Sequence, residues 1–111
     1  HFITLGSING LSTRMMVDTG ATAVAMSSAE AKRLGIDYAK GQRGWTSTAS
    51  GIVPYFNVTL NSVKVGDIQH YQVAGAVIEG NSPTIVLLGM SFLSRVQMHR
   101  EGTSMTLTKS Y

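Results

Sequence analysis

An aspartate, a threonine and a glycine follow an apolar run near the front of this sequence, at Asp18, Thr19 and Gly20. The preceding residues, Met15 to Val17, are typical of a buried strand, so the carboxylate of Asp18 is expected where that strand gives way to a turn. The Thr19 hydroxyl can hold such a loop together, and Gly20 permits a sharp turn and the close approach of another chain. A carboxylate that is anchored by the core yet open to solvent is suited to acid-base chemistry.

The same three residues have a plain structural interpretation, because Asp, Thr and Gly are all common in turns. A second stretch of sequence favours the interpretation that these residues carry chemistry. Ile85 to Gly89 is another apolar run broken by glycine, and the helix-like segment from Met90 to Ser94 follows it. The two motifs together, at this spacing, indicate a functional loop at Asp18.

The elements that must position this loop begin with a hairpin. Phe2 to Ile8 and Leu11 to Val17 are apolar-rich and are separated by Asn9-Gly10, a pair that predicts a tight antiparallel turn. After the Asp18 turn, Ala23 to Met26 continues as an extended segment.

A short helix is predicted next. Ser27 to Glu30 reads as a capping box that opens a helix through Leu34, and Gly35 is its C-terminal stop. Lys32 and Arg33 fall at the end where the helix dipole favours cations, so their charge needs no functional explanation.

A long hairpin with a small tip is predicted in the middle of the chain, with strands from Gly41 to Ser47 and from Ile52 to Leu60. Its aromatic residues Trp45, Tyr55 and Phe56 could simply pair across the strands. The alternative, which stays open, is that at least one of them closes over a ligand. The tip consists of Thr48, Ala49, Ser50 and Gly51.

The remaining segments complete an all-β pattern of short strands, glycine turns and one or two short helices. They are a turn at Gly66-Asp67, an alternating strand over Tyr71 to Ile78, a loop over Glu79 to Pro83, and a final hairpin of Val96 to Arg100 and Thr103 to Lys109. No internal repeat appears, so residues 1–111 are expected to form a single domain.

Composition excludes several classes of function. The 111 residues are 43% hydrophobic and 14% charged, which suits one compact domain, and no run of 18 apolar residues indicates a membrane span. The net charge of +3 comes from scattered Lys and Arg, without the basic cluster typical of a nucleic-acid site. The chain has no Cys, its histidines lack paired metal-ligand spacing, and no phosphate-binding glycine motif occurs, so neither a metal nor a cofactor is expected.

On these motifs the sequence resembles the retroviral-type (retropepsin-like) aspartic proteases over nearly its whole length, and most closely their bacterial single-domain members. The matching segments are Val17 to Ala21 for the catalytic loop, Leu87 to Gly89 for the apolar-glycine support, and Gly41 to Leu60 for the flap. The resemblance implies a closed, barrel-like β lobe with a flap hairpin. Two departures are Thr22, where viral enzymes usually carry Asp, and a flap tip poorer in glycine.

Only one carboxylate per chain suits the chemistry of this family. Of the six acidic residues, Asp18 alone stands in the strand-end, Thr-Gly context; Glu30 is accounted for as a helix cap, and the others fall in turns, loops or solvent. Hydrolysis by carboxylates needs one as base and a protonated one as partner. The dyad must therefore come from Asp18 of two chains in a homodimer.

The resemblance also implies roles for the neighbouring residues. Thr19 would bond across the two-fold axis, Gly20 would accept substrate backbone, and Leu88 and Gly89 would brace Asp18 from below. The substrate would be an extended polypeptide lying under the flap. Its expected contacts are Ala21, Thr22, Val24, Ile85 and Leu87 from the lobe, and Trp45, Thr48, Ala49, Ser50 and Gly51 from the flap.

Two other functions remain possible on the sequence: a non-catalytic dimerisation or peptide-binding module on the same fold, and a small all-β ligand carrier. The chain begins at His1-Phe2 as if in mid-strand and without an initiator Met, which indicates a fragment or processed product. The compartment stays open from the residues; the resemblance alone would place the protein in a bacterial envelope, anchored through an N-terminal segment, with no membrane or nucleic-acid contact by residues 1–111.

Overall fold

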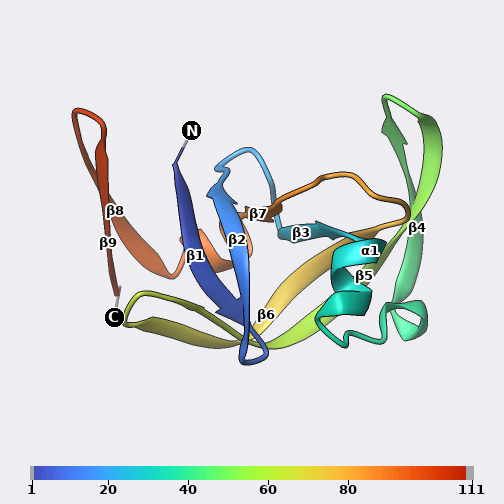
Figure 1. Cartoon of the computed structure of the whole chain (residues 1–111), viewed down its shortest axis with the longest axis horizontal. Coiled ribbons are helices and arrows are strands. Elements are labelled where there is room, and N and C mark those ends of the chain that lie inside the picture. Colours follow the sequence, from blue (N-terminus) through green and yellow to red (C-terminus); the bar gives the residue numbers. More distant parts are fainter. Residues whose placement is uncertain (1, 110–111) are drawn as a thin grey trace.

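The computed structural model describes residues 2–109, and strands make up most of it (Figure 1). In chain order the elements are β1 (Ile3–Ile8), β2 (Leu11–Val17), β3 (Val24–Ser27), α1 (Ser28–Arg33), the 3-10 helix η1 (Tyr38–Lys40), β4 (Gln42–Thr48), β5 (Gly51–Val65), β6 (Ile68–Ile78), β7 (Val86–Leu88), α2 (Met90–Leu93), β8 (Val96–Glu101) and β9 (Ser104–Lys109). His1, which belongs to the predicted start of the chain, lies outside the described residues. Neither α-helix has the length and apolarity that crossing a membrane requires.

Six of the strands close into a barrel. Their order is β1-β2-β7-β3-β6-β5, and β5 pairs back with β1 to complete the ring. Closure brings the two strands very near one another at Gly6, where a Cβ atom would lie 2.6 Å from the Lys64 carbonyl oxygen. The barrel interior is apolar, with Ile8, Met15, Leu60, Val73 and Phe92 among its fully buried side chains. The closed lobe implied by the resemblance is confirmed.

Local turn chemistry set the hairpins where the sequence predicts them. Asn9 and Gly10 both have positive φ, as a two-residue hairpin turn requires, and join β1 to β2 in antiparallel register. The turn at Gly66-Asp67 is also confirmed, whereas the last hairpin turns one residue later than predicted, at Gly102-Thr103, because Glu101 still belongs to β8 and pairs with Ser104. The strands differ in length from the prediction: β5 runs on to Val65, and β6 already begins at Ile68.

A kink in β6 at Gln72 was not foreseen. Gln72 has φ 53°, and both it and Tyr71 are exposed, so the alternation of buried and exposed side chains shifts phase at this point. The Arg95 guanidinium holds the kink by donating to the carbonyl oxygens of Tyr71 and Gln72 at 2.8 and 3.0 Å. Because of this kink, β6 places buried side chains in the barrel interior both before and after Gln72, as Ile68 and Val73 show.

Helix α1 begins as predicted but uses Glu30 differently. The Ser27 hydroxyl accepts the Glu30 backbone N–H at 3.1 Å, which is one half of a capping box. The Glu30 carboxylate does not complete the box; it instead accepts hydrogen bonds from Arg33 and from the buried Thr13 of β2. Glu30 is therefore a link between α1 and the barrel, and the interpretation of it as a cap was incomplete.

Two hairpins extend beyond the barrel (Figure 1). The β4–β5 hairpin stands at one end, and the β8–β9 hairpin forms a separate two-stranded sheet at the other. Both rise on the same side as the loop that follows β2, which lies between them. The chain thus presents the predicted catalytic loop between two projecting hairpins.

Candidate active site

Asp18 lies directly after β2, half-buried, in a loop held by backbone hydrogen bonds. Its N–H donates to the Leu88 carbonyl oxygen at 3.1 Å, and its own carbonyl oxygen accepts the Ala21 N–H at 3.2 Å. The carboxylate oxygen Oδ1 accepts the Gly20 N–H at 2.9 Å. The loop therefore fixes both the backbone and the carboxylate of Asp18.

The second sequence motif supplies the support from the neighbouring strand β7 and from α2, which follows it. The first residues of α2 donate to the Asp18 loop: Met90 N–H to the Ala21 carbonyl at 2.8 Å, and Ser91 N–H to the Thr22 carbonyl at 2.9 Å. The Ser91 hydroxyl accepts the Val24 N–H at 3.2 Å and donates to the Ala74 carbonyl at 2.7 Å. Ser91 thus links the Asp18 loop to β6. The sequence did not predict this role, because Ser91 belongs to no recognisable motif.

Gly89 allows this close contact. A Cβ atom at this position would lie 2.1 Å from the Ala23 carbonyl oxygen and 2.8 Å from that of Ala21. Both obstacles are backbone atoms, which cannot move aside as a flexible side chain would. The apolar-glycine motif is therefore placed where glycine alone fits beneath the Asp18 loop.

The predicted loop residues lie together at the surface. Thr19, Gly20 and Thr22 are exposed and Ala21 is half-buried. No hydrogen-bond partner of the Thr19 hydroxyl occurs among residues 2–109, so this group is available to a substrate or to a second chain. A side chain at Gly20 would crowd the carboxylate, since a Cβ there would lie 3.2 Å from Asp18 Oδ1.

The predicted apolar walls are only partly placed as expected. Leu87 is half-buried and pairs in register with Met16 of β2 and Ala25 of β3. Met16 is half-buried on the face of β2 opposite the buried Met15, two residues before Asp18, and the alternation of side chains along a strand could have identified it from the sequence. Val24 is a correction: its exposed fraction is 0%, so it packs in the core and does not line a surface.

The predicted flap is a hairpin whose tip stands apart from the Asp18 loop (Figure 1). At the tip the Thr48 hydroxyl donates to the Gly51 carbonyl at 2.9 Å and accepts the Ser50 N–H at 3.2 Å, while Ala49 and Ser50 form the exposed turn. The structure gathers these residues with one another but not with Asp18.

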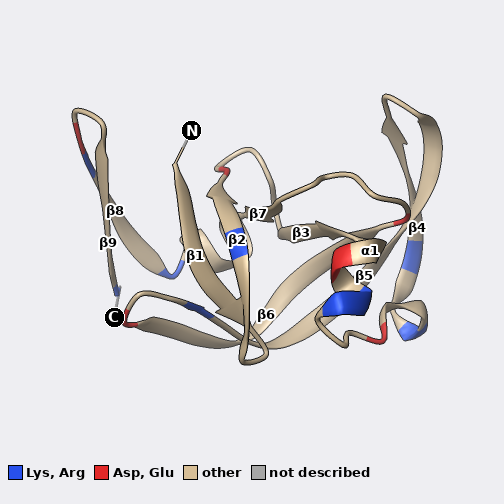
Figure 2. Cartoon of the chain, viewed as in Figure 1, with Lys and Arg blue, Asp and Glu red and all other residues tan. Residues whose placement is uncertain are grey.

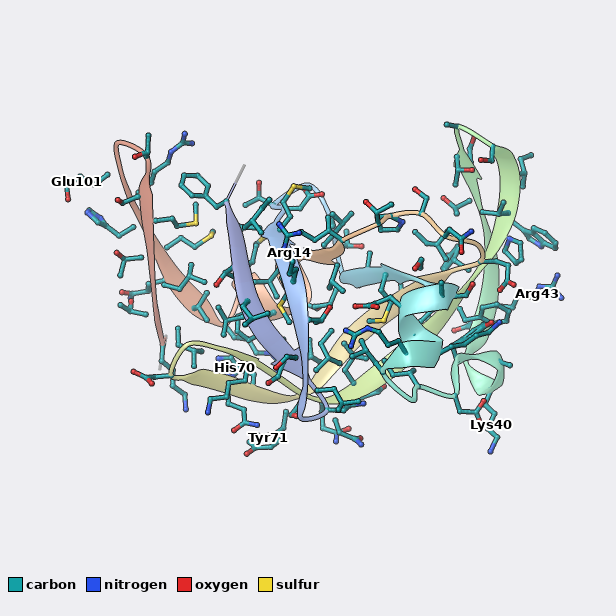
Figure 3. All side chains as sticks on the ribbon, viewed as in Figure 1. Arg14, Lys40, Arg43, His70, Tyr71 and Glu101 are labelled. Atoms are coloured by element: carbon teal, nitrogen blue, oxygen red, sulfur yellow. The ribbon has the colours of Figure 1, made fainter. Side chains whose placement is uncertain are left out.

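Trp45 lies on β4 of this hairpin and is 62% exposed. Its ring centroid lies 4.6 Å from the Arg43 guanidinium, and the Arg43 side chain points away from the body of the molecule (Figure 3). Contact between Trp45 and a substrate stays a prediction.

The other acidic residues have structural partners or lie on the surface. Hydrogen bonds from Arg33 lower the pKa of Glu30, and the bond from Thr13 acts in the same direction against the effect of burial. Lys40 pairs with Asp37 at 3.3 Å, and Tyr38 donates to Glu79 at 3.4 Å. Across residues 2–109, no group of three or more His, Asp or Glu side chains is arranged to hold a metal ion.

A closed six-stranded lobe, an Asp-Thr-Gly loop at its surface and an apolar-glycine brace beneath that loop define a retropepsin-like aspartic protease domain. The family model described as gag-polyprotein putative aspartyl protease matches residues 4–95. The chain belongs to this family.

Solved structures agree with the assignment. The retropepsin-like aspartic protease from Rickettsia conorii is 33% identical, with a TM-score of 0.80 over 96% of this chain and 88% of that one. The EIAV protease complexed with the inhibitor HBY-793 is 22% identical and shares the fold, with a TM-score of 0.61 over 84% of this chain and 85% of the other.

Two curated relatives are uncharacterized proteins. One, from the cobV 5′ region of Sinorhizobium sp., is 33% identical over 88% of this chain and 42% of its own length. The other, RP867 of Rickettsia prowazekii (strain Madrid E), is 37% identical over 90% of this chain and 43% of its own length. The chain thus spans less than half the length of these relatives.

Proposed function

We propose that two copies of this chain form an aspartic endopeptidase that hydrolyses peptide bonds in extended polypeptides. The observation that carries this proposal is the bracing of Asp18: a surface carboxylate whose backbone is bonded to Leu88 and whose loop rests on Gly89 and α2. A turn aspartate without a chemical task has no need of such support from a distant part of the chain.

The reaction needs two carboxylates close together. The ionised one takes a proton from water, and the protonated one donates to the carbonyl oxygen of the scissile bond. At about 4 Å and an effective dielectric near 20, two negative charges repel by about 4 kcal/mol, so the pair retains one proton over a wide pH range. The paired carboxylates of aspartic proteases are the standard example of this effect.

The second carboxylate would come from Asp18 of another copy. Among the described residues no other carboxylate lies in the braced loop. In the dimer, Thr19 of each chain would bond across the axis, Gly20 would meet the substrate backbone, and Met16, Ile85 and Leu87 would form apolar walls. The flap tips, Thr48 to Gly51, would close over the substrate.

The projecting hairpins suit this assembly. The described residues pair β8 with β9 alone, so both outer edges of this small sheet are open to a further strand. At its base a cavity of about 570 Å³ is lined by Phe2, Val17, Ile68 and Leu107 among others. Val17 lines this cavity and immediately precedes Asp18. Contacts made by a second copy at this hairpin would therefore affect the position of the catalytic loop.

The test is cleavage of a mixed peptide library at mildly acidic pH by the unmodified protein and by Asp18→Asn, with pepstatin in a parallel reaction. We expect cleavage that pepstatin blocks and that the variant lacks, while both proteins sediment as dimers. The cut sites would then define the apolar pockets. Dimers without any cleavage would contradict the proposal and favour the peptide-binding module instead.

A further inference from the structure

A second pocket, of about 300 Å³, opens at the start of β2. Strand β7 pairs with β2 only from Met15 onward, so β7 leaves the edge of β2 uncovered over Ser12 to Arg14. Helix α1 and the segment Thr84-Ile85 surround this edge and form the pocket with it. The pocket therefore forms because β7 is staggered relative to β2.

The pocket carries one uncompensated positive charge. Its single acidic residue, Glu30, is matched by Arg33, whose Nε and Nη2 donate to the two carboxylate oxygens at 2.7 and 2.8 Å. Arg33 is further held by the Ser12 carbonyl oxygen at 2.9 Å. The remaining charged residue of the lining is Arg14, which has no hydrogen bond or ion pair among residues 2–109.

Apolar side chains stand beside this free guanidinium. Leu5 lies directly opposite Arg14 in the β1–β2 register and is 66% exposed, and Ile85 closes the other side. Figure 3 places Arg14 beside β2 in the middle of the molecule, whereas Lys40 and Arg43 lie at its flap end. Figure 2 shows the other basic residues scattered over the chain, so Arg14 is not part of a general basic face. A ligand side chain with a short apolar stem and a terminal carboxylate fits this combination of a free guanidinium and apolar neighbours.

The pocket continues the expected substrate path. Arg14 and Met16 share one face of β2 by alternation, Asp18 directly follows the strand, and Ile85 leads into β7, whose Leu87 pairs with Met16. At about 3.3 Å per residue, Arg14 lies about 13 Å along the strand from Asp18, the span of about four residues of an extended peptide. When the cleaved bond of a substrate lies at Asp18, the substrate residue that reaches the pocket would therefore be about four residues away from that bond.

We propose that this pocket is a subsite for an acidic side chain of the substrate, and that Arg14 recognises its carboxylate. The inference rests on the proposed peptidase function and adds to it a substrate class: polypeptides with Glu or Asp about four residues from the cleaved bond. Leu5 and Ile85 favour Glu over Asp, because its longer apolar stem covers more of their surface.

The first experiment measures kcat/KM for a peptide series in which a single Glu or Gln is placed three, four or five residues to either side of a known cut. We expect Glu to exceed Gln about fivefold at one position at low salt, and the ratio to fall as salt is raised. Arg14→Gln should bring the Glu/Gln ratio to about one, and Arg14→Glu should invert it. Lys32→Gln, an exposed basic residue of α1 outside the pocket, is the matched control and should retain the ratio.

The second experiment separates failure of this inference from failure of the peptidase proposal. Isothermal titration of the same Glu and Gln peptides into the Asp18→Asn protein reports binding without cleavage. A Glu preference that Arg14→Gln removes supports the subsite even if the unmodified protein cuts nothing. Equal affinity for Glu and Gln peptides, or a preference that survives Arg14→Gln, overturns the inference whether or not peptides are cleaved.

Discussion

Single residues hold the candidate site together in two ways: a glycine without a side chain permits close packing, and polar side chains add hydrogen bonds. Gly89 lets α2 approach the Asp18 loop to a distance that no side chain permits, and the loop then receives its backbone hydrogen bonds from Met90 and Ser91. Glu30 acts at the same scale on the other side of β2, where it joins α1 to the buried Thr13. Each residue has a distinct physical consequence when it is changed.

Gly89→Ala is expected to destabilise the protein by about 3 kcal/mol or more, because the added methyl overlaps two backbone carbonyl oxygens that the barrel holds in place. The measurement is the free energy of unfolding in urea. Gly35→Ala is the matched control: nothing lies within 4 Å of its Cβ position, and its φ of +72° alone predicts a cost of about 1 kcal/mol. Equal losses in the two variants would show that the close approach at Gly89 is unimportant.

The Glu30 carboxylate predicts a pH dependence of stability. Hydrogen bonds from Arg33 hold its pKa below its ordinary value of 4.5 in the folded chain. A lowered folded pKa means that the stabilisation is present above about pH 4.5 and is lost as the pH falls through the folded pKa. Because the pair is partly exposed, the contribution is at most about 1 kcal/mol.

Urea unfolding from pH 7 to pH 3 checks this expectation. Glu30→Gln should lose stability at neutral pH and show a smaller fall toward pH 3 than the unmodified protein. Asp67→Asn, whose carboxylate is exposed in the turn between β5 and β6 and makes no ion pair among residues 2–109, should follow the unmodified curve. Parallel curves for Glu30→Gln and the unmodified chain would count against the role of this carboxylate.

At the scale of elements, α2 acts as a clamp between two parts of the barrel. Its Ser91 hydroxyl is bonded to β3 at Val24 and to β6 at Ala74, and its Arg95 neighbour holds the kink at Gln72. A helix of 4 residues cannot be stable alone, so these contacts are what keeps it folded. The stability of the helix and the placement of the Asp18 loop are thus coupled.

Ser91→Ala is expected to cost about 1 to 3 kcal/mol, since it leaves the Val24 N–H and the Ala74 carbonyl without their partner. Amide hydrogen exchange provides the second measurement, and Val24 should exchange faster in the variant. Ser94→Ala removes a hydroxyl from the exposed end of the same helix and should change stability by less than about 0.5 kcal/mol. If the two serines proved equivalent, α2 would not be the clamp described here.

The elements differ in how far the sequence could predict them. The hairpin turns at Asn9-Gly10 and Gly66-Asp67 followed from local residue chemistry. The kink at Gln72 depends on Arg95, which lies far along the chain. The burial of Val24 depends on the position of its strand, β3, between β6 and β7 and on packing in the core cluster. These features arise from contacts between distant residues, and periodicity does not report such contacts.

At the scale of the whole molecule, the proposed function makes the chain half of a symmetric site. The Asp18 loop lies between the β4–β5 and β8–β9 hairpins, which project on the same side of the barrel (Figure 1). A two-fold arrangement that brings two Asp18 loops together would also bring like hairpins together, as an isologous interface requires. The proposed enzyme would then be inactive as a single chain, and its activity would fall steeply on dilution.

Mixing two forms of the chain tests this stoichiometry. When unmodified protein and Asp18→Asn are unfolded together, combined in equal amounts and refolded, random pairing leaves about a quarter of the dimers with two aspartates. If both carboxylates are needed, activity per total protein falls to about a quarter of that of the unmodified protein, against about a half if each chain holds a complete site. Asp37→Asn, which alters an exposed aspartate between α1 and η1, is the matched control, and mixing with it should leave activity unchanged. A fall only to about one half would show that each chain holds a complete site, and a fall only to about three quarters would show that one Asp18 suffices in a shared site. In either case the dyad would have to be abandoned while the fold and the family remained.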